Sequence, residues 1–446
     1  MNEPLKVGLA GLGTVGCGVI RMLDHSNGDD IARKLGRPLK VTAVCARDKN
    51  KDRGVDISSY SWFDTPEELA KSGDIDVYVE LTGGTDGPAL EATKIALQRG
   101  LDVVTANKAM LAVHSTELAK LAEENGCALL FEAAVAGGIP IVKSIKESLS
   151  GNRIQRVYGI LNGTCNYMMT AMQNEGKPFD EILKAAQAEG YAEADPSFDV
   201  GGIDAAHKLA LLTTLSFGTE TSFKDIYIEG IEKITPEDIK AADDLGYRIK
   251  LLGVALKTDE GIEQRVHPTL VPSESAIGQV SGVTNCVCVD GDYVGKIMQV
   301  GPGAGEGPTA SSVVGDLIEA ARFDKSENTV RPVFSMPVDK LAPYQRAPLR
   351  AHEGGYYVRL TLSDRPGTFA AIATRMAEFG ISLESIVQRS HGSSADEKVD
   401  AAGVAAAPVV IITHDTTEQA VAEALKAIEE DGHIVGQPNM IRIERL

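Results

Sequence analysis

Residues 190–208 combine four carboxylates and one lysine in a loop that leads into a helix. The acids are Glu193, Asp195, Asp199 and Asp204, and Lys208 follows the last of them by four positions. Residues four apart lie on one face of a helix, one turn from each other. Acids crowded beside a lysine on a partly apolar helix are typical of a site that binds and activates a polar small molecule, although a solvated helix face gives a similar pattern.

A glycine-rich turn follows the first predicted strand, residues 5–10. Gly11, Gly13 and Gly16 form the pattern G-x-G-x-x-G, and a helix pattern comes next. Glycines permit a tight turn and a close approach of the backbone, and the free N–H groups of a helix N-terminus can bind a pyrophosphate. This strand–turn–helix setting predicts a dinucleotide site that also includes Thr14 and Val15, rather than a merely structural turn.

The end of the second predicted strand, residues 40–45, bears on the choice of dinucleotide. A site for NAD usually has an acid there, which binds the ribose 2′-hydroxyl. This chain has Arg47 instead, with further basic residues close behind. A guanidinium suits a 2′-phosphate, so the sequence favours NADP. The neighbouring Asp48 leaves NAD possible, and a basic surface loop is the plainer alternative.

Two later strand ends carry further candidates. Strand 101–105 is followed by Lys108, and in an open α/β sheet the loops at the carboxyl ends of the strands line the ligand crevice. We therefore expect Lys108 to reach the nicotinamide end of the cofactor, the alternative being a lysine that extends into solvent. Strand 128–132 ends in Glu132. A carboxylate followed by loop carbonyls is suited to a hard cation, but spacing alone favours a plain helix start near Pro140.

Composition and charge restrict the possible partners. The 446 residues are too many for one core and predict two or three domains. The net charge of −19 argues against nucleic acid or an anionic membrane as the main partner. No run approaches the ~20 apolar residues of a membrane helix, and the N-terminus lacks a signal-peptide pattern. The six scattered cysteines suit buried thiols in a reducing cytoplasm, where we expect the protein to work.

The order of predicted elements indicates an α/β fold with several domains. Residues 1–140 alternate strands and helices, as in a Rossmann-type domain. Residues 141–300 predict a mixed α+β domain for substrate and oligomerisation, with a sheet of its own. A second glycine-rich loop then includes Gly303 and opens a helix within residues 301–325, which we expect to pack back on the first domain.

The C-terminal part of the chain has a different pattern. A proline-rich linker over residues 326–353 precedes a tail, residues 354–446, with the order strand, helix, strand, strand, helix, strand. This is the βαββαβ pattern of a ferredoxin-like fold. The segment 390–406 is rich in Ser, Gly and Ala and is expected to be a mobile loop. The tail has no catalytic cluster, so binding or assembly is its expected role.

From residue 1 to about residue 325 the chain resembles the homoserine dehydrogenase family. The resemblance rests on motifs that keep the family's order and show no departure: G-L-G-T-V-G, T-A-N-K ending at Lys108, A-V-A-G-G-I-P from Ala134, G-I-L-N-G-T-C-N-Y from Gly159, G-Y-A-E-A-D-P from Gly190, G-I-D with Lys208, and P-T-A-S-S-V-V-G-D from Pro308. The tail, with the sequence D-R-P-G ending at Gly367, is similar to an ACT regulatory domain.

The resemblance implies NAD(P)-dependent interconversion of L-aspartate 4-semialdehyde and L-homoserine, on the route to threonine, isoleucine and methionine. It implies that Lys208 is the catalytic lysine and that Lys108 lies at the cofactor and substrate. Glu193 and Asp204 match the family's homoserine-binding acids. During hydride transfer, charge builds on the substrate oxygen, which a positioned ammonium can stabilise and protonate.

The same resemblance implies further binding groups. Gly190 and Gly303 fall where the family contacts the cofactor. A monovalent-cation site, for sodium, is implied at Glu132 and the carbonyl groups of Val135, Gly137 and Ile139. The ACT-like tail implies feedback by an end-product amino acid, threonine first, bound near Gly367 at the start of helix 368–379. Pairing of such tails makes a homodimer or homotetramer the expected assembly.

Two other functions are compatible with parts of the sequence. Aspartate-semialdehyde dehydrogenase shares cofactor and metabolite but needs a cysteine nucleophile with a histidine partner, for which Cys165 is the candidate in a suitable loop. A ligand-sensing protein would combine nucleotide and ACT domains without turnover. The acids and lysine of residues 190–208 speak against it.

Overall fold

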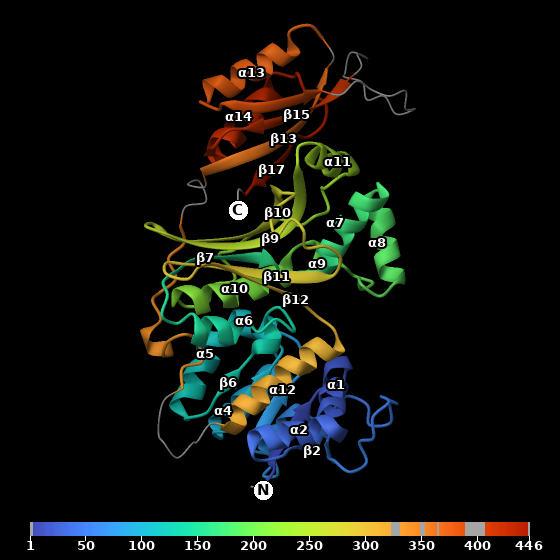
Figure 1. The fold of residues 1–446 in the computed structure, drawn as a ribbon, viewed down its shortest axis with the longest axis vertical. Coiled ribbons are helices and arrows are strands. Elements are labelled where there is room, and N and C mark those ends of the chain that lie inside the picture. Colours follow the sequence, from blue (N-terminus) through green and yellow to red (C-terminus); the bar gives the residue numbers. More distant parts are fainter. Residues whose placement is uncertain (1–2, 323–330, 348–352, 364, 389–405, 445–446) are drawn as a thin grey trace.

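The computed structural model describes residues 3–322, 331–347, 353–363, 365–388 and 406–444. The molecule is elongated, with an N-terminal lobe at one end and a C-terminal lobe at the other (Figure 1). Asp364 lies outside the described residues, as do parts of the predicted linker 326–353 and nearly all of the predicted loop 390–406. In the described ranges, no helix has both the length and the apolar composition that crossing a membrane requires.

The N-terminal lobe is built on a six-stranded parallel sheet with the order β3-β2-β1-β4-β5-β6. Its strands are β1 (Leu5–Ala10), β2 (Leu39–Cys45), β3 (Ser61–Phe63), β4 (Val77–Glu80), β5 (Asp102–Thr105) and β6 (Leu129–Leu130). They are mostly Val, Leu and Ala, as expected for strands buried on both faces. This is the doubly wound order of the expected Rossmann-type domain, and its reversal between β1 and β4 places a ligand crevice at the carboxyl ends of these strands.

Helices cover both faces of this sheet. One face packs against α1 (Thr14–Leu23), α2 (His25–Leu35) and α12 (Glu306–Arg322), which share one hydrophobic core with β1. The other carries α3 (Pro66–Lys71), α4 (Pro88–Gln98) and α5 (Lys108–Glu124). Helix α12 comes from far along the chain, and its residues Ala310, Val313 and Leu317 are buried in the core of the N-terminal lobe.

The middle and the C-terminal lobe share one sheet of eleven strands, so the prediction of a separate sheet for residues 141–300 is wrong. The order is β12-β11-β7-β9-β10-β17-β13-β15-β14, with β8 (Tyr227–Ile228) on β10 and β16 (Thr416–Thr417) on β13. The middle contributes β7 (Ile154–Ile160), β9 (Tyr247–Thr258), β10 (Gly261–Pro272), β11 (Thr284–Gly291) and β12 (Gly295–Pro302). Two parallel pairs, Thr269 with Arg442 and Leu270 with Ile443, join β10 to β17 (Asn439–Ile443).

Helices of the middle part position the candidate residues. They are α6 (Ile141–Lys143), continued by a π-helical turn at Ser144–Ser148, then α7 (Gly163–Glu175), α8 (Phe179–Ala188), α9 (Ser197–Val200), α10 (Ile203–Phe217) and α11 (Pro236–Asp244). All but two residues of α10 are buried, because this helix lies between the large sheet and the N-terminal lobe (Figure 1).

The C-terminal lobe has the predicted βαββαβ order. Its elements are β13 (Glu353–Ser363), α13 (Thr368–Glu378), β14 (Leu383–Gln388), β15 (Ala406–Thr413), α14 (Glu418–Glu430) and β17. Helices α13 and α14 pack on one face through Ile372, Met376, Val421 and Ile428. The opposite face of this lobe meets α11, where the buried Asp238 accepts hydrogen bonds from Arg359 of β13.

Candidate active site

Two lysines bind the two oxygens of one buried carboxylate, that of Asp204. The Lys208 ammonium lies 2.7 Å from Oδ2, and the Lys108 ammonium lies 2.8 Å from Oδ1. Lys208 also donates to the carbonyl of Leu161 at the end of β7, at 2.7 Å. Residues 102–108 and 203–208, which are far apart in the sequence, thus meet at one group.

Each lysine is positioned by a separate element. Lys208 lies one turn after Asp204 on α10, as the spacing of four predicts. Lys108 is the first residue of α5. Asn107 caps α5, because its side-chain oxygen accepts from the amide of Met110 at 3.1 Å while its Nδ2 donates to Gly84 at 2.7 Å. This cap fixes where Lys108 leaves the backbone.

Asn162 joins two of the acids. Its Nδ2 donates to Asp204 at 2.8 Å and to Asp199 at 2.7 Å, and its Oδ1 caps α7 by accepting from Cys165. Sequence reasoning did not select Asn162, although its place directly after a buried strand and before a helix was a signal for a cap. The amide allows two carboxylates to lie close together, because it donates to both.

Burial and charge act against each other at these groups. Burial alone would raise the pKa of Asp204, but the charges of Lys208 and Lys108 outweigh it and hold that pKa well below the usual range. Burial lowers the pKa of Lys208, opposed by the charge of Asp204. For the more exposed Lys108, burial is outweighed by the attraction of Asp204, which raises its pKa. Lys208 is therefore the more easily deprotonated of the two ammonium groups.

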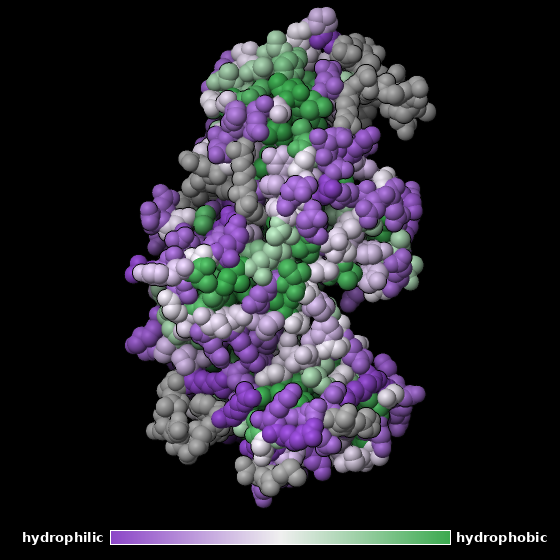
Figure 2. Space-filling view, in the orientation of Figure 1, coloured by the Kyte–Doolittle hydropathy of each residue, from purple (hydrophilic) through white to green (hydrophobic). Residues whose placement is uncertain are grey.

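These residues line a cleft of about 630 Å³ between the N-terminal lobe and the middle part. Figure 2 shows the surface indented between these two parts. Exposed Glu193 lines the cleft with Gly190, whereas Asp195 is exposed and binds the amide of Ser197 at 3.1 Å. The cleft wall also includes Val15 and Gly303 from the expected cofactor side, and Gly137 from the expected cation site.

The glycine-rich loop has the geometry of a phosphate-binding turn. A Cβ added at Gly11 would lie 2.4 Å from the Leu81 carbonyl oxygen, and one at Gly16 would lie 2.0 Å from that of Gly11. At Gly13 an added Cβ would meet nothing within 4 Å. Gly11 and Gly16 therefore serve the close packing of strand and helix, while Gly13 leaves space over the start of α1, where Thr14 and Val15 follow.

Two arginines follow β2, and they differ in environment. Arg47 is exposed directly after the strand. Arg53 is less exposed, and its Nε donates to the Leu12 carbonyl at 3.2 Å, inside the glycine-rich loop. Arg53 therefore supports that loop, and Arg47 is free to meet solvent or a ligand at the strand end.

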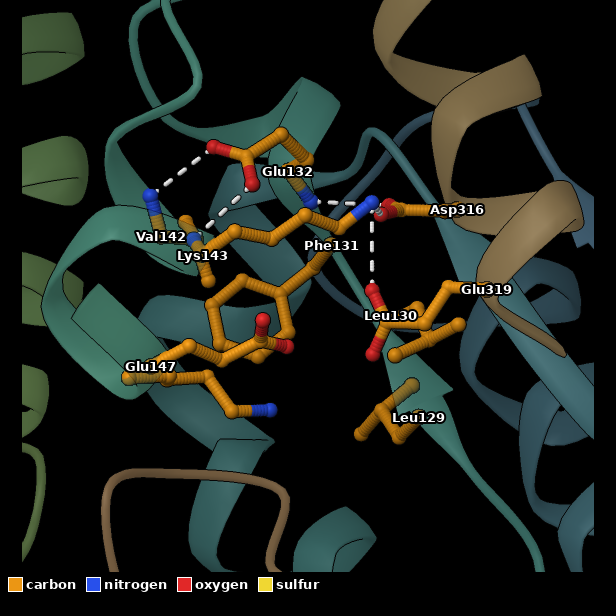
Figure 3. A pocket seen from close by; sticks show the side chains of 10 residues that line it. Leu129, Leu130, Phe131, Glu132, Val142, Lys143, Glu147, Asp316 and Glu319 are labelled. Atoms are coloured by element: carbon orange, nitrogen blue, oxygen red, sulfur yellow. Dashed lines mark hydrogen bonds and ion pairs between the residues drawn. The ribbon is translucent and has the colours of Figure 1, made fainter. Parts of the chain in front are cut away.

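The predicted cation ligand Glu132 lies in a 3₁₀ turn, Glu132–Ala134, rather than in a strand. Its two carboxylate oxygens accept from the amides of Val142 at 2.8 Å and Lys143 at 3.0 Å (Figure 3). The carboxylate thus caps α6. Its pKa is raised to about 7, mainly by burial. Among the described residues no group of three or more Asp, Glu, His or Cys side chains is placed to hold a metal ion.

The loop after Glu132 contains an unusual backbone conformation. Ala136, with φ 55°, is the one residue other than glycine with a positive φ in the described ranges, and Gly137 follows with φ 57°. The carbonyl of Gly137 accepts from Ser312 at 2.7 Å, and that of Ile139 accepts from the amide of Ile141 at 2.8 Å. Each atom in the expected ligand set is a hard oxygen with more than one lone pair. The chemistry of this set therefore fits a sodium ion even with these hydrogen bonds in place.

His207 and Cys165 lie near the acids but differ from them in chemistry. His207 lies between Phe198 and Phe223, with ring centroids 5.4 and 4.4 Å away and ring planes tilted by 55° and 50°, and burial lowers its pKa to about 4. Cys165 is buried, donates to the Asp199 carbonyl at 3.2 Å, and has a pKa raised well above its usual value by burial. A buried, protonated thiol is a poor nucleophile, which argues against a cysteine-dependent dehydrogenase.

Asn285 is a second residue that sequence reasoning missed. It lines the cleft from β11, is 1% exposed, and neither Nδ2 nor Oδ1 has a hydrogen-bond partner in the described part of the chain. A buried polar atom without a partner costs about 1–3 kcal/mol. Its contacts with Gly163 and Gly303 join residues that are not sequence neighbours, so no local pattern indicates it.

Comparison with known proteins decides the family. Residues 11–132 match the model for the homoserine dehydrogenase NAD binding domain, residues 140–318 match that for homoserine dehydrogenase, and residues 356–432 match the ACT domain. The homoserine dehydrogenase of Pseudomonas aeruginosa is 45% identical over 448 residues, which cover 100% of both chains. The chain belongs to the homoserine dehydrogenase family.

Solved homoserine dehydrogenases have the same architecture. The enzyme from Thiobacillus denitrificans is 40% identical and superposes with a TM-score of 0.92, covering 100% of this chain and 99% of that one. A hyperthermophilic archaeal homoserine dehydrogenase in complex with NADPH is 26% identical with a TM-score of 0.62, covering 74% of this chain and 100% of that one. This homoserine dehydrogenase is therefore an oxidoreductase acting on a CH–OH group, with a nicotinamide dinucleotide-binding domain and an ACT domain.

Proposed function

We propose that Lys208 protonates the substrate oxygen during reduction of L-aspartate 4-semialdehyde and that Lys108 assists it as a second cation. The observation that carries this is Asp204 held between the two ammonium groups. A bound nicotinamide dinucleotide supplies the hydride to the aldehyde carbon. Lys208 uses two of its three N–H groups on Asp204 and Leu161 within the described residues, which leaves one for the substrate oxygen.

Glu193 and Asp204 are proposed to bind the α-ammonium group of the substrate through charge-assisted hydrogen bonds. Support comes from their place in the lining of one cleft, with Asp199 held to Asp204 through Asn162. The test is initial-rate assay of Glu193→Gln against Asp195→Gln. The first should raise the KM for L-homoserine, and the exposed Asp195 is the matched control. Equal KM values in both variants would contradict the assignment.

NADP is proposed as the preferred cofactor, with NAD as the alternative. Gly11, Gly13, Thr14, Val15 and Gly16 would hold the pyrophosphate. Arg47 would meet the 2′-phosphate, and Lys108, Gly190 and Gly303 would adjoin the nicotinamide. The exposed position of Arg47 at the end of β2 supports the 2′-phosphate contact.

A sodium site is proposed at Glu132 with the carbonyls of Val135, Gly137 and Ile139. The left-handed Ala136, between two of these carbonyls, supports it, because an unusual backbone conformation marks a constrained site. Thermal unfolding of wild type and Glu132→Gln should be compared in sodium chloride and in choline chloride at equal ionic strength. A sodium-dependent rise in Tm in the wild type alone is expected, and equal Tm values in both salts would refute the site.

Feedback by threonine through the ACT domain, near Gly367, is the proposed regulation. Two contacts support coupling between the ACT domain and the active site. Arg442 of β17 lies 3.8 Å from Glu229. Two residues further along, the amide of Ile231 donates to the carbonyl of Val200 of α9 at 2.9 Å. Asp199 precedes that residue. Glu229→Gln should weaken threonine inhibition with little change in uninhibited turnover, while exposed Glu232→Gln should not. Inhibition unchanged in Glu229→Gln would exclude this route.

The assembly and the division of the chain are also proposals. Strand β14 lies at the end of the large sheet, and its Ile386 side chain is 43% exposed, which supports side-by-side pairing into a homodimer or homotetramer. Light scattering of Ile386→Lys against wild type tests this. We also propose three domains, over residues 1–140, 141–300 and 354–446. A cytoplasmic location is proposed as well.

A further inference from the structure

The Asn285 side chain is a cleft group that the proposed mechanism does not use. Asn285 pairs with Gly301 across β11 and β12, next to Cys286, which pairs with Ile160 at the end of β7. It lines the cleft although only 1% of its surface is exposed. Its amide is therefore placed in the wall of the active site, with both polar atoms unpartnered among the described residues.

The amide lies between the cofactor side and the substrate side of the cleft. A Cβ added at Gly303 would fall 2.1 Å from Nδ2 of Asn285, so the amide rests directly on that backbone. Gly303 in turn meets the N-terminal lobe, because a Cβ at Gly137 would lie 2.3 Å from its carbonyl oxygen. On the other side, a Cβ at Gly163 would lie 3.3 Å from Oδ1. Gly163 follows Asn162, which donates to Asp199 and to the proposed substrate-binding acid Asp204.

A neighbouring amide shows what a structural role looks like here. Asn166, also buried, donates from Nδ2 to the carbonyls of Val280, Gly282 and Thr284 at 3.3, 2.9 and 3.2 Å, and its Oδ1 accepts from Lys250 at 3.2 Å. Its hydrogen-bonding capacity is used by the protein itself. An amide with none of these bonds, in a cleft wall, is suited to a ligand instead.

We propose that Asn285 binds the carboxamide group of the nicotinamide and so fixes the orientation of the ring. A carboxamide presents one acceptor and an adjacent donor, and so does the Asn285 side chain, so the two can form a pair of hydrogen bonds. The α-ammonium of the substrate only donates and its carboxylate only accepts, so either would leave one Asn285 atom unpaired. This inference rests on the proposed place of the nicotinamide between Lys108 and Gly303.

The test compares NADPH with its 3-acetylpyridine analogue, in which a methyl group replaces the amide NH₂. Affinities are measured from the fluorescence of the reduced ring, and kcat/KM is measured with L-aspartate 4-semialdehyde. In Asn285→Leu the preference for NADPH over the analogue should fall about 10-fold relative to wild type, because the hydrogen bond from the carboxamide NH₂ to Oδ1, which the analogue cannot form, is lost. The KM for the semialdehyde should change less than about twofold. Asn285→Asp keeps an acceptor for the carboxamide NH₂, so its preference for NADPH over the analogue should lie between those of wild type and Asn285→Leu.

Thr284→Ala is the matched control, since Thr284 adjoins Asn285 on β11 and does not line the cleft. It should keep the wild-type preference. An unchanged preference in Asn285→Leu would overturn the proposal. If the affinities for both cofactors fell equally, the amide would be assigned to packing against Gly303 instead. Because the affinities are measured without turnover, a wild type that binds NADPH but reduces no semialdehyde would refute the proposed roles of the lysines and leave the cofactor preference measurable.

Discussion

The carboxylate of Asp204 and the ammonium of Lys208 are 2.7 Å apart and both buried, one turn from each other on α10. In such a buried pair, each charged group stabilises the other and so replaces the water that burial removes. Removal of one partner from a buried pair commonly costs about 3–5 kcal/mol, because the other charge is left uncompensated. Here Lys108 and Asn162 also bind Asp204, so loss of Lys208 should harm activity more than folding.

Lys208→Ala is expected to lower kcat by about 10²–10⁴-fold, because the proton donor and the cation at the substrate oxygen are both lost. Initial rates with L-homoserine across a range of pH, with far-UV circular dichroism to verify folding, measure this. Lys177→Ala, which removes an exposed lysine that binds Glu175, is the control. Turnover near the wild-type value at every pH would show that Lys208 is not the proton donor.

Asn162→Ser should separate the cap of α7 from the bonds to the acids. Serine can still cap a helix, so the free energy of unfolding should fall by less than about 1 kcal/mol. The two bonds to Asp199 and Asp204 are lost, and we expect kcat/KM for L-homoserine to fall about 10-fold. Urea unfolding and initial rates are the measurements. A variant with normal kcat/KM would show that Asn162 only caps the helix.

Arg47→Ala and Arg53→Ala should differ in their effect on the two cofactors. Arg47 is exposed, and its loss should raise the KM for NADPH about 10–100-fold with little change for NADH. Arg53 donates to the Leu12 carbonyl of the glycine-rich loop, so its loss should raise the KM for both NADPH and NADH. KM values for NADPH and NADH in both variants test this, and equal effects of Arg47→Ala on both cofactors would contradict a 2′-phosphate contact.

His207 should make the folded state less stable in acid. Its folded pKa of about 4 lies below the usual unfolded value near 6.5, so the unfolded chain binds the extra proton first. The contribution of neutral His207 to the free energy of unfolding is complete above about pH 6.5 and is lost as the pH falls toward 4. Between about pH 7 and pH 5 we expect a loss of about 2 kcal/mol. Urea unfolding of wild type and His207→Phe at both pH values should show this loss in the wild type only.

Asp238→Asn should loosen the contact between α11 and the ACT domain. The Asp238 carboxylate accepts from Arg359 at 2.6 Å, from the Tyr357 hydroxyl at 3.0 Å and from Asn439 at 3.0 Å. Loss of its charge leaves Arg359 less well paired, and we expect the free energy of unfolding to fall by about 2–4 kcal/mol. Chemical unfolding measures it, with exposed Glu237→Gln as the control. Equal stability of the two variants would show that the contact contributes little.

The sequence predicts those parts of the fold and the site that have local signals. The glycine turn after β1 and the spacing of Asp204 and Lys208 depend on neighbouring residues, and the structure has both as expected. A local pattern indicates at most the helix cap of Asn162, because the acids that Asn162 binds are distant in the sequence and the partner proposed for Asn285 is absent from the chain. The pairing of β10 with β17 was missed for the same reason, since strand pairing depends on the packing of the whole sheet.

The union of β10 with β17 has a consequence for synthesis of the chain. Thr269 and Leu270 leave the ribosome long before Arg442 and Ile443, their partners in the sheet. Until those partners are made, part of the β10 edge is open to strands of other nascent chains. Completion of the sheet is therefore the step that protects a newly made molecule from aggregation, and we expect slow translation of the ACT domain to lower the soluble yield.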